Sequence, residues 1–358
     1  MRVAYTLEQC WHRVPGGTAV AALEIARAMP NVRPDVELLG VSGTHGDDPA
    51  VDFDLSIDVA GLPSKRPLLY ETMLRFRWPK VESVWPNLDL VHSTTIVPFA
   101  TSRPLVVTVH DLANLRYPEF FPRRGNAVFR RSLRAIRKRA DRIIVSSRAT
   151  YDDCIAAGLE PERLRLVPLG VRVVEPSPEE TTKVLEALDV PTSYLLFVGT
   201  IEPRKNLSRL IEAVMSDSTL PPLVVAGASG WGDAARSVDT ERVHFVGHVD
   251  DLSLRVLYRS AMAFVYPSLW EGFGLPILEA MAQGAPVVTS RGTSTEEVAG
   301  SAAVLVDPST ASSIADGIAE ALRNREEWTT RSRARASEMT WDAAARATAA
   351  VYDELVRT

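Results

Sequence analysis

Cysteine is scarce in this chain. Only two of its 358 residues are cysteines, Cys10 and Cys154, and they lie far apart in the sequence. Such a pair cannot build a disulfide framework, and neither member has the spacing of a zinc-binding motif. The composition therefore excludes a small disulfide-stabilised secreted protein and fits a reducing compartment, so we expect a cytoplasmic protein.

Long apolar runs are also missing. No stretch approaches the roughly 20 apolar residues that a helix needs to span a bilayer. The sequence opens with MRVAYTLEQ, which is typical of a strand rather than of the charged and apolar segments of a signal peptide. We therefore expect neither a transmembrane helix nor a cleaved leader.

An excess of positive charge is absent as well, because 40 lysines and arginines are outnumbered by 45 aspartates and glutamates, for a net charge of −5. This balance gives no global reason to expect a nucleic-acid partner. The hydrophobic fraction of 46% and the charged fraction of 24% are ordinary for a globular protein. The length suits two domains better than one.

Short apolar runs alternate with helical stretches through the first half of the chain. Parallel strands that are buried on both faces and connected by helices have this pattern. The predicted strands lie at residues 2–7, 36–41, 88–93, 105–110 and 142–147, and the predicted helices at 19–29 and 123–140. The first half therefore predicts a doubly wound α/β domain.

A second unit of the same kind follows a break in this pattern. The segment VVEPSPEETTK (173–183), with two prolines and a cluster of acids, is the best linker candidate. Strands are predicted after it at residues 194–200, 223–227, 243–247, 263–268, 285–290 and 303–307. We therefore predict two Rossmann-like domains, 1–172 and 173–340, with ligand at the carboxyl ends of their strands, and a final helix that begins at Trp341.

The run EGFGLPILEA (271–280) carries the clearest chemistry. Gly272 and Gly274 have no Cβ, so their backbone can approach a ligand closely. Pro276 suits the first turn of a helix, whose free N–H groups form an anion site. Glu271 before that turn and Glu279 two turns later could bind sugar hydroxyls. The run therefore indicates a site for a nucleotide sugar.

An ordinary buried helix after a glycine turn explains part of the same run, since Leu275, Ile277, Leu278 and Met281 would form a core stripe. The two interpretations are compatible. The run also resembles the E-x7-E motif of retaining glycosyltransferases with the GT-B fold, and in particular of family 4. The resemblance implies an acceptor domain (1–172), a donor domain (173–340), and a last helix (341–358) that packs back on the first domain.

The run VGTIEPRKNL (198–207) places two cations directly after a predicted strand, beside a helix start. It resembles the first loop of the family's donor domain, in which an arginine just after the glycine and a lysine five positions later contact the diphosphate. Lys205 falls on that lysine, whereas Thr200 replaces the arginine, so Arg204 is expected to supply the second cation. Solvated basic residues at a helix start remain the alternative.

Other donor-contacting residues are expected from the resemblance alone. In the donor domain these are His248 and Val249 in a loop that reads the nucleobase, together with Ser268, Phe273 and Leu275 around the acidic motif. In the first domain, the weak Gly16-Gly17 pair between a strand and the helix 18–29 resembles the glycine loop beside the donor phosphates.

His110 ends a predicted strand of the first domain. A histidine in that position is more often structural than catalytic, but the setting resembles the family's histidine that orients the donor sugar. Ser146-Ser147-Arg148 resembles a further loop near the donor. His12 and Arg13 are candidates for the acceptor or for the surface, and a surface role is expected for Arg255 and Tyr258.

One rival motif points to a metal. Asp52-Phe53-Asp54 formally matches the D-x-D of metal-dependent, single-domain glycosyltransferases, but no glycine-rich segment or strand run accompanies it, so we reject it. No other histidine or carboxylate cluster has metal-site spacing. We therefore expect metal-independent chemistry, with no cofactor besides the nucleotide-sugar donor.

The stretch 123–142 is dense in arginine. Phe129, Leu133, Ile136 and Ala140 lie at helical spacing and predict an amphipathic basic helix. Such a helix in a net-acidic protein suggests attraction to anionic lipid or to a phosphorylated acceptor at the inner face of the membrane. A solvated helix that packs its apolar face on the sheet is the alternative.

The resemblance spans almost the whole chain and implies sugar transfer to a hydroxyl acceptor with retention. In that mechanism Glu271 holds the donor sugar, Glu279 the ribose, and Lys205 with Arg204 the departing diphosphate. The runs GTIEPRKNL, HDL and RYPEFF most resemble the mannosyltransferase-like branch, which often uses GDP-mannose, so the resemblance implies that donor. A UDP- or dTDP-sugar enzyme, an epimerase and a silent nucleotide-sugar-binding scaffold are the alternatives. The segments 42–65 and 112–125 contain no readable motif for the acceptor.

Overall fold

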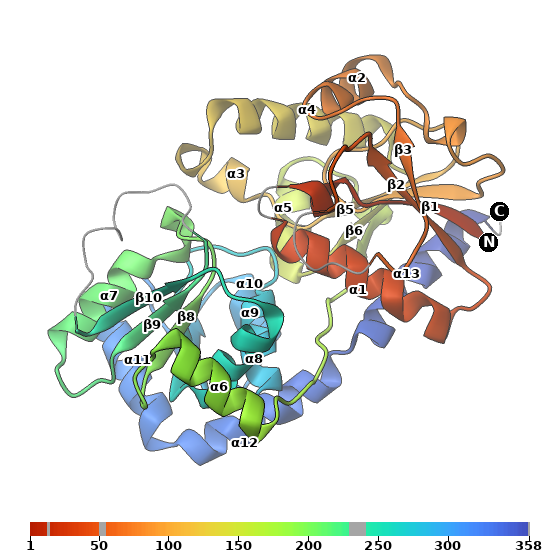
Figure 1. Cartoon of the computed structure of the whole chain (residues 1–358). Helices are drawn as coiled ribbons and strands as arrows, with labels where there is room; N and C mark the ends of the chain where they lie inside the picture. Colours follow the sequence, from red (N-terminus) through yellow and green to blue (C-terminus); the bar gives the residue numbers. More distant parts are fainter. Residues whose placement is uncertain (13–14, 50–54, 229–240, 357–358) are drawn as a thin grey trace. The chain divides into compact units, whose positions relative to one another are not determined.

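The computed structural model describes residues 1–12, 15–49, 55–228 and 241–356. It divides into two compact units, which Figure 1 colours along the chain. Unit 1 comprises Met1–Gly170 together with Trp341–Thr358, and unit 2 comprises Val171–Thr340. Each unit is an α/β domain built on its own parallel sheet, as the alternation of apolar runs and helices predicted.

Unit 1 contains a seven-stranded parallel sheet in the order β3-β2-β1-β4-β5-β6-β7. The predicted strands are confirmed. They were readable in the sequence because their apolar runs are almost completely buried. The bounds are β1 Arg2–Thr6, β2 Glu37–Gly43, β3 Val59–Leu62, β4 Leu90–Ser93, β5 Leu105–Val109, β6 Arg142–Val145 and β7 Leu164–Leu166. The edge strands β3 and β7 were not predicted.

Helices cover both faces of this sheet. One face packs against α2, α4 and α5, whose apolar residues join the same core as the strands, and the other lies against α1 and α13. The bounds are α1 Gly16–Val32, α2 Leu68–Phe76, α3 Ala113–Arg116, α4 Arg123–Arg139, α5 Arg148–Ala156 and α13 Trp341–Val356.

Two predicted boundaries in unit 1 are wrong. Helix α1 begins at Gly16 instead of residue 18, so the glycine pair forms the first helical turn instead of a separate loop. The basic helix ends at Arg139, because Ala140 is extended and Arg142 already pairs with Val106 as the first residue of β6.

A buried histidine ties α13 to the sheet. His92, on β4, is 1% exposed. Its Nδ1 lies 2.7 Å from the hydroxyl of Tyr352 on α13, and its Nε2 lies 2.7 Å from Oγ1 of Thr108 on β5. Burial lowers the pKa of His92 to about 3, with His110 as a second cause, so the ring is neutral near pH 7. The C-terminal helix is thus attached to unit 1 by a specific polar contact.

Unit 2 contains a six-stranded parallel sheet in the order β10-β9-β8-β11-β12-β13. All six predicted strands are confirmed, with bounds β8 Leu195–Val198, β9 Leu223–Ala226, β10 Val243–Gly247, β11 Ala263–Tyr266, β12 Val287–Ser290 and β13 Val304–Val306. The helices are α6 Pro178–Leu188, α7 Leu207–Ser216, α8 Asp251–Ser260, α9 Leu275–Ala282, α10 Ser294–Ala299, α11 Ala311–Arg323 and α12 Arg325–Glu338.

The predicted linker is partly wrong, because its second half is helical. Pro178 starts α6, and Ser177 caps it by accepting a hydrogen bond from the N–H of Glu180, whose carboxylate returns a bond to the N–H of Ser177. Only residues 171–177 therefore connect unit 1, which reaches Gly170 before this crossing, to the first helix of unit 2.

The strand order of unit 2 reverses direction between β8 and β11. In doubly wound sheets the loops at such a point diverge to opposite faces and leave a crevice at the carboxyl ends of the strands. The loop after β8 carries the Arg204-Lys205 pair, and the loop after β11 carries the acidic motif. The topology therefore brings together the two sequence runs with the strongest expected chemistry.

Candidate functional site in unit 2

The loops that follow β8 and β11 are joined directly. The backbone N–H of Leu269 donates to the carbonyl of Arg204 across 2.8 Å. Asn206 adds a second link, since its side-chain amide donates to the carbonyls of Pro267 and Pro308, and its backbone is left-handed with φ of 60°. The predicted site residues on the two loops are thus held in a fixed relation.

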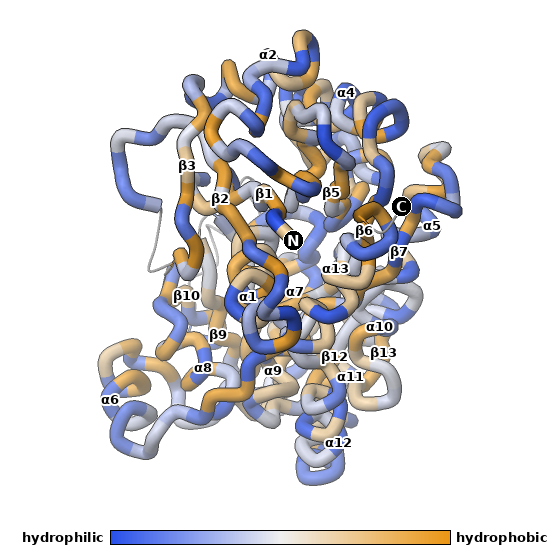
Figure 2. The backbone as a smooth tube through the Cα atoms, turned by 90° about the vertical axis from the view of Figure 1, so that its right-hand side faces the viewer, coloured by the Kyte–Doolittle hydropathy of each residue, from blue (hydrophilic) through white to orange (hydrophobic). Residues whose placement is uncertain are grey.

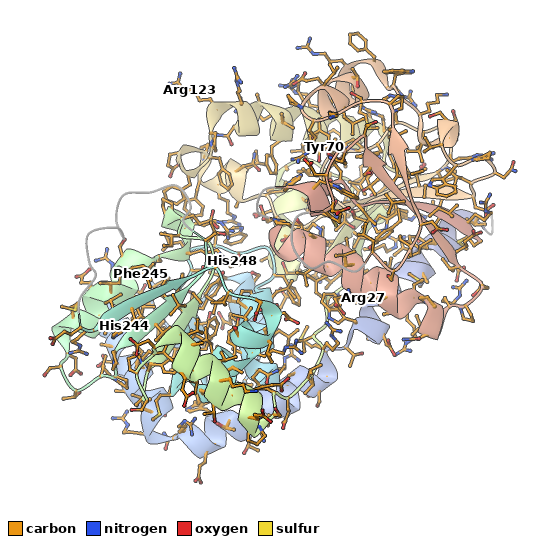
Figure 3. The ribbon with its side chains drawn as sticks, in the orientation of Figure 1. Arg27, Tyr70, Arg123, His244, Phe245 and His248 are labelled. Atoms are coloured by element: carbon orange, nitrogen blue, oxygen red, sulfur yellow. The ribbon has the colours of Figure 1, made fainter. Side chains whose placement is uncertain are left out.

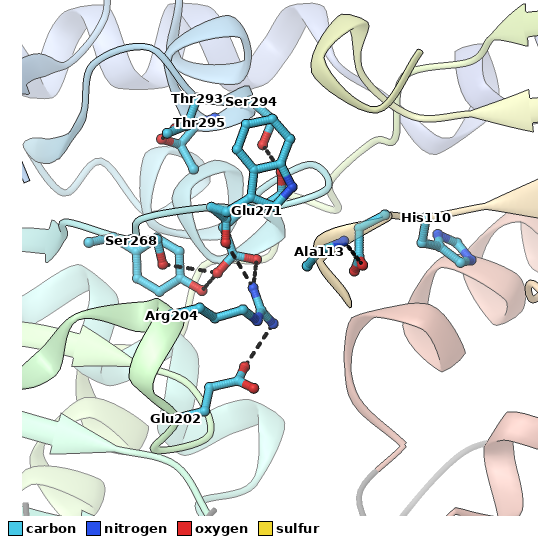
Figure 4. A network of polar contacts seen from close by, with 12 residues as sticks. His110, Ala113, Glu202, Arg204, Ser268, Glu271, Thr293, Ser294 and Thr295 are labelled. Atoms are coloured by element: carbon cyan, nitrogen blue, oxygen red, sulfur yellow. Dashed lines mark hydrogen bonds and ion pairs between the residues drawn. The ribbon is translucent and has the colours of Figure 1, made fainter. Parts of the chain in front are cut away.

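Glu271 lies at the centre of the polar network in Figure 4. Its Oε1 accepts hydrogen bonds from the Tyr266 hydroxyl at 2.8 Å and from Ser268 Oγ at 3.0 Å, while Arg204 Nη1 lies 2.7 Å from its Oε2. Its backbone carbonyl accepts a further bond from Ser294 Oγ at 2.6 Å. The side chain is therefore locked in one orientation, as a group that positions a substrate must be.

The charge state of Glu271 follows from the same contacts. Burial alone would raise the pKa of this carboxyl. The charges of Arg204 and Lys205 and the hydrogen bonds from Arg204 and Tyr266 outweigh that effect and leave its pKa below the ordinary value. Glu271 is therefore an ionised hydrogen-bond acceptor near neutral pH.

Arg204 is held between two carboxylates. Nη2 lies 2.7 Å from Oε1 of Glu202, Nη1 lies 2.7 Å from Oε2 of Glu271, and Nη1 also donates to the Trp270 carbonyl at 3.0 Å. The guanidinium therefore orients Glu271, which the sequence did not predict. Its expected contact with a diphosphate stays a prediction.

Lys205 is a better candidate than Arg204 for binding an anion. It lies on the short helix Pro203–Lys205, is 8% exposed, and holds its ammonium 5.5 Å from the centre of the Tyr266 ring. Among the residues that the structure describes, none accepts a hydrogen bond from Nζ. Burial is the largest cause of a lowered pKa for Lys205, with the Glu271 charge acting against it. An anionic ligand would compensate the desolvated ammonium.

Gly199 makes room for this lysine. Its φ is +144°, and a Cβ there would lie 2.3 Å from Lys205 Nζ. The neighbouring Gly227 is equally constrained, because a Cβ on it would lie 2.2 Å from the Gly199 carbonyl oxygen. The end of β8 therefore requires glycine for packing around the ammonium as well as for its backbone conformation.

Glu279 lies on α9 and has the opposite electrostatic setting. Its Oε2 accepts a hydrogen bond from the Tyr258 hydroxyl at 3.1 Å. Burial raises the pKa of Glu279 to about 7, with the Asp251 charge acting in the same direction and the Tyr258 bond against it. The two glutamates of the motif therefore differ, with Glu271 ionised and Glu279 close to its midpoint at neutral pH.

The start of α9 lies between the two glutamates in sequence. Gly274 precedes the helix with φ of +106°, and Pro276 occupies its first turn. No side-chain cap occupies the first N–H groups of this helix. Gly272, Phe273 and Leu275 are buried beside it. The predicted glycine turn and core stripe are confirmed here, whereas the anion site at the helix start stays a prediction.

The remaining candidates of unit 2 follow the ends of neighbouring strands. Thr200 is half-buried after β8, and Ser268 is fully buried after β11. His248 is exposed and Val249 half-buried in the loop after β10, and Figure 3 shows His248 at the end of that strand. These positions share the carboxyl edge of the sheet with the acidic motif.

The expected surface role of Tyr258 is wrong. Its side chain is 1% exposed, because α8 packs against α9, and its hydroxyl bonds Glu279. Arg255, on the same helix, does lie at the surface side and pairs with Asp251 at 2.6 Å. The sequence also gave no sign that Glu202 and Tyr266 belong to the site. Glu202 looked like an ordinary acidic residue of a loop, and Tyr266 like an ordinary core residue of a strand.

The candidates of unit 1 lie at the carboxyl edge of its own sheet. His110 Nε2 donates to the Thr94 carbonyl at 2.9 Å, so Nδ1 is left as an acceptor, and burial lowers its pKa. Gly16 and Gly17 are exposed at the start of α1, where Gly16 has φ of +62°. Ser147 caps α5 by accepting a bond from the Thr150 N–H. Arg13 and the rejected Asp52-Phe53-Asp54 motif lie outside the described residues.

Unit 1 also contains a polar cluster that the sequence did not reveal. Glu8, only 1% exposed, receives hydrogen bonds from the Gly43 N–H at 2.6 Å and lies 3.0 Å from His45 Nε2 and 2.8 Å from Arg66 Nε. Burial, followed by the Arg66 charge, lowers the pKa of the neighbouring His12 to about 4. These residues follow β1, β2 and β3, and the unpredicted β3 explains why Arg66 was missed.

Comparison with known proteins agrees with these features. Residues 15–175 match the family model described as Glycosyltransferase Family 4, and residues 179–339 match Glycosyl transferases group 1. The chain belongs to glycosyltransferase family 4. It is therefore a hexosyltransferase, and both halves of the sequence resemblance are confirmed.

Curated relatives include bacterial polysaccharide enzymes. The chain is 34% identical over 254 residues to O-antigen chain mannosyltransferase B of Escherichia coli, a match covering 66% of this chain and 67% of that protein. It is 32% identical over 215 residues to O-antigen chain mannosyltransferase RfbU of Salmonella typhimurium, covering 58% and 57%. Several relatives are thus matched over little more than half of their length.

Solved structures share the fold over the full chain. Sucrose-phosphate synthase from Thermosynechococcus elongatus aligns with a TM-score of 0.79 at 21% identity, covering 100% of this chain and 99% of that one. HepE of Anabaena, solved with UDP and glucose, aligns with a TM-score of 0.76 at 19% identity, covering 99% and 100%. The fold is GT-B, with two Rossmann-like domains, as predicted.

Proposed function

We propose that this glycosyltransferase moves a sugar from a nucleotide-diphosphate donor to a hydroxyl of a glycan or lipid-linked acceptor, with retention and without a metal ion. The observation that carries the proposal is the fixed arrangement of Glu271, Arg204 and Lys205 at the carboxyl edge of the unit 2 sheet. An ionised acceptor for sugar hydroxyls and a buried cation for phosphate are the two groups that such a donor requires.

The chemistry follows from where charge develops. As the bond to the anomeric carbon breaks, negative charge accumulates on the departing diphosphate. Lys205 and the start of α9 would stabilise that charge without reorganising, since both are already held in place. This positive field takes the part that a metal ion plays in metal-dependent transferases.

The two glutamates take different roles in this scheme. Glu271 would accept hydrogen bonds from hydroxyls of the donor sugar, because its carboxylate is ionised and oriented by Arg204. Glu279 would bind the ribose hydroxyls of the nucleotide. Binding to its ionised form would shift its proton equilibrium, so donor affinity should fall as the pH drops below about 7. The contact of His110 with the donor sugar remains a prediction from the family resemblance.

GDP-mannose is the donor that we propose. The run GTIEPRKNL with Lys205, the run HDL after β5 and the run RYPEFF resemble the mannosyltransferase-like branch. The names of the E. coli and Salmonella relatives point the same way. The same names suggest the synthesis of a bacterial polysaccharide as the setting for the acceptor.

Thermal shift and turnover across GDP-, UDP-, ADP- and dTDP-sugars, with and without EDTA, test this proposal. Selective stabilisation by GDP-mannose with EDTA-resistant transfer or hydrolysis is expected. Lys205→Ala should lose the shift, whereas Lys183→Gln, at the exposed Lys183–Glu179 pair of α6, should keep it. Stabilisation by another sugar nucleotide would show that GDP-mannose is not the donor. Stabilisation by none of them would contradict the proposal and favour a silent scaffold.

A further inference from the structure

The buried tyrosines in the described part of the chain differ in what their hydroxyl groups contact. Each of the following is at most 1% exposed: Tyr5, Tyr194, Tyr258, Tyr266 and Tyr352. A buried hydroxyl costs free energy unless it forms a hydrogen bond. The hydroxyls of Tyr5 and Tyr194 each donate to a backbone carbonyl at 2.9 Å. That of Tyr352 contacts the neutral ring of His92. In these three tyrosines the hydroxyl therefore contacts an uncharged group of the core.

Tyr258 and Tyr266 instead donate to the two glutamates of the acidic motif. The Tyr266 hydroxyl lies 2.8 Å from Oε1 of Glu271. The Tyr258 hydroxyl lies 3.1 Å from Oε2 of Glu279. A hydrogen bond to a charged carboxylate is roughly twice as strong as one between neutral groups. These two hydroxyls therefore contact the groups that hold the donor in the proposed function.

The rings that carry these hydroxyls belong to one stack of aromatic side chains. Phe264 and Tyr266 alternate with one residue between them on β11, so they lie on the same face of the sheet, with ring centres 5.6 Å apart. Tyr258, on α8, packs edge-on against Phe264 with ring centres 5.2 Å apart. We call Tyr258, Phe264 and Tyr266 the aromatic column. The column is buried along its whole length, with Glu271 bonded at one end and Glu279 at the other.

The aromatic column connects different elements of unit 2. Strand β11 leads into the loop that carries Glu271, whereas Glu279 lies on α9. Helix α8 packs against α9, and Figures 1 and 2 both show these two helices side by side. Aromatic rings in a close-packed interior have few alternative arrangements. The distance between the two carboxylates is therefore fixed by buried rings as well as by the backbone between them.

Tyr266 also contacts the cation of the site. The centre of its ring lies 5.5 Å from Nζ of Lys205, within the range of a cation–π interaction. The ring thus faces the lysine while the hydroxyl bonds Glu271. The two contacts can be separated by substitution, because phenylalanine keeps the ring and lacks the hydroxyl.

We propose that Tyr266 and Tyr258 are positioning residues of the donor site, and that the aromatic column holds Glu271 and Glu279 at the separation that a sugar nucleotide spans between its sugar and its ribose. This inference rests on the proposed function, which takes the sugar and the ribose as ligands of the two glutamates. If the tyrosines were core residues alone, phenylalanine at either position would change stability and leave donor recognition as it is.

Calorimetry with GDP-mannose and GDP separates positioning from packing. Tyr266→Phe keeps the ring beside Lys205, so its affinity for GDP should match that of wild type. Its affinity for GDP-mannose should fall about tenfold, because Glu271 loses a hydrogen bond that orients its charged carboxylate. Tyr266→Leu removes the ring as well and should weaken the binding of both ligands.

A measurement without ligand tests Tyr258. Burial raises the pKa of Glu279, with the Asp251 charge in the same direction, whereas the Tyr258 hydrogen bond and the Lys205 charge lower it. Tyr258→Phe should therefore raise this pKa further, and the variant should lose more stability towards urea at pH 8 than at pH 5. The extra loss at pH 8 should vanish when Tyr258→Phe is combined with Glu279→Gln, which carries no charge.

Tyr194→Phe is the matched control. It removes a buried hydroxyl that bonds the carbonyl of Leu257 on the same helix as Tyr258, at 2.9 Å. Its loss of stability should be the same at pH 5 and pH 8, and its affinities for GDP and GDP-mannose should match wild type.

Phe264→Leu tests the column as a unit, because this apolar side chain forms no hydrogen bond to either glutamate. It should weaken the binding of GDP-mannose more than that of GDP. The proposal would be overturned by an unchanged ratio of the two affinities in Tyr266→Phe and Phe264→Leu, by a pH-independent loss of stability in Tyr258→Phe, or by the same defects in Tyr194→Phe. Wild-type protein that binds neither ligand would contradict the proposed function instead, and the pH comparison of Tyr258→Phe would still decide whether the column acts on Glu279.

Discussion

Replacing Glu279 by glutamine should stabilise the protein in a pH-dependent way. Glu279 has a folded-state pKa of about 7, against an ordinary value of 4.5, chiefly because it is buried. A carboxyl with a raised pKa contributes stability that is fully present below pH 4.5 and is lost as the pH rises through 7. Wild-type protein at pH 8 must therefore hold a charged carboxylate in this setting, and the glutamine variant need not.

The magnitude follows from the shift. A difference of about 2.5 units at 1.36 kcal/mol per unit gives at most about 3 kcal/mol, an upper bound because part of the side chain reaches solvent. Glu279→Gln should gain up to that amount at pH 8 and less than about 1 kcal/mol at pH 5. Because glutamine has the size of the protonated acid, the Tyr258 hydrogen bond can be kept in both.

Urea unfolding at a series of pH values measures this difference. The two units need not unfold together, so an absolute free energy of unfolding is not well defined for the whole chain. The quantity of interest is therefore the difference between variant and wild type at each pH. Glu271→Gln is the matched control with the opposite sign, since the pKa of Glu271 is lowered and its charge stabilises the fold at neutral pH. An equal gain for Glu279→Gln at pH 5 and pH 8, or a loss at pH 8, would refute the reasoning.

Three further substitutions test the packing of the two units. Gly199→Ala should displace the Lys205 ammonium, since its Cβ would lie 2.3 Å from Nζ, and should weaken donor binding at least about tenfold by calorimetry. Gly292→Ala, which also has positive φ but open space around its Cβ, should lose only about 1 kcal/mol of stability with donor affinity unchanged. Tyr352→Phe removes the hydroxyl that lies 2.7 Å from His92 and should destabilise unit 1 by about 1–2 kcal/mol in thermal melts, without changing the Michaelis constant for the donor. A donor defect in Gly292→Ala or Tyr352→Phe would contradict these assignments.

The strands were predictable because burial on both faces leaves a continuous apolar run in the sequence. Two edge strands escaped that rule. Strand β3, with the sequence VAGL, is only half-buried and contains a glycine, and β7 has three residues. Edge strands contact one neighbour and need less apolar surface, so their sequences resemble loops.

The acidic motif was predictable because its chemistry is local in sequence. A glycine turn, a helix start and two carboxylates lie within nine residues, and the structure adds the pKa contrast between Glu271 and Glu279. The partners of Glu271 were not predictable to the same degree, since Arg204 lies in the loop after β8 and Tyr266 in β11, and only the tertiary structure places them together.

The basic helix illustrates the same division. Its amphipathic pattern predicted both the helix and its buried apolar side, and Leu133 and Ile136 are indeed in the core. Its end at Arg139 was missed, because helix propensity continues into Ala140 while pairing with β5 fixes Arg142 as strand.

The most direct test of the account is single-turnover sugar transfer by Glu271→Ala and Glu271→Gln, with the stability of each variant checked by thermal melting. Both variants should lose transfer by at least about a hundredfold, because neither presents an ionised acceptor to the donor sugar. Arg134→Gln, on the outer side of α4, serves as the control and should transfer to a soluble acceptor at the wild-type rate. Wild-type turnover in a folded Glu271→Ala protein would contradict the central role of this carboxylate.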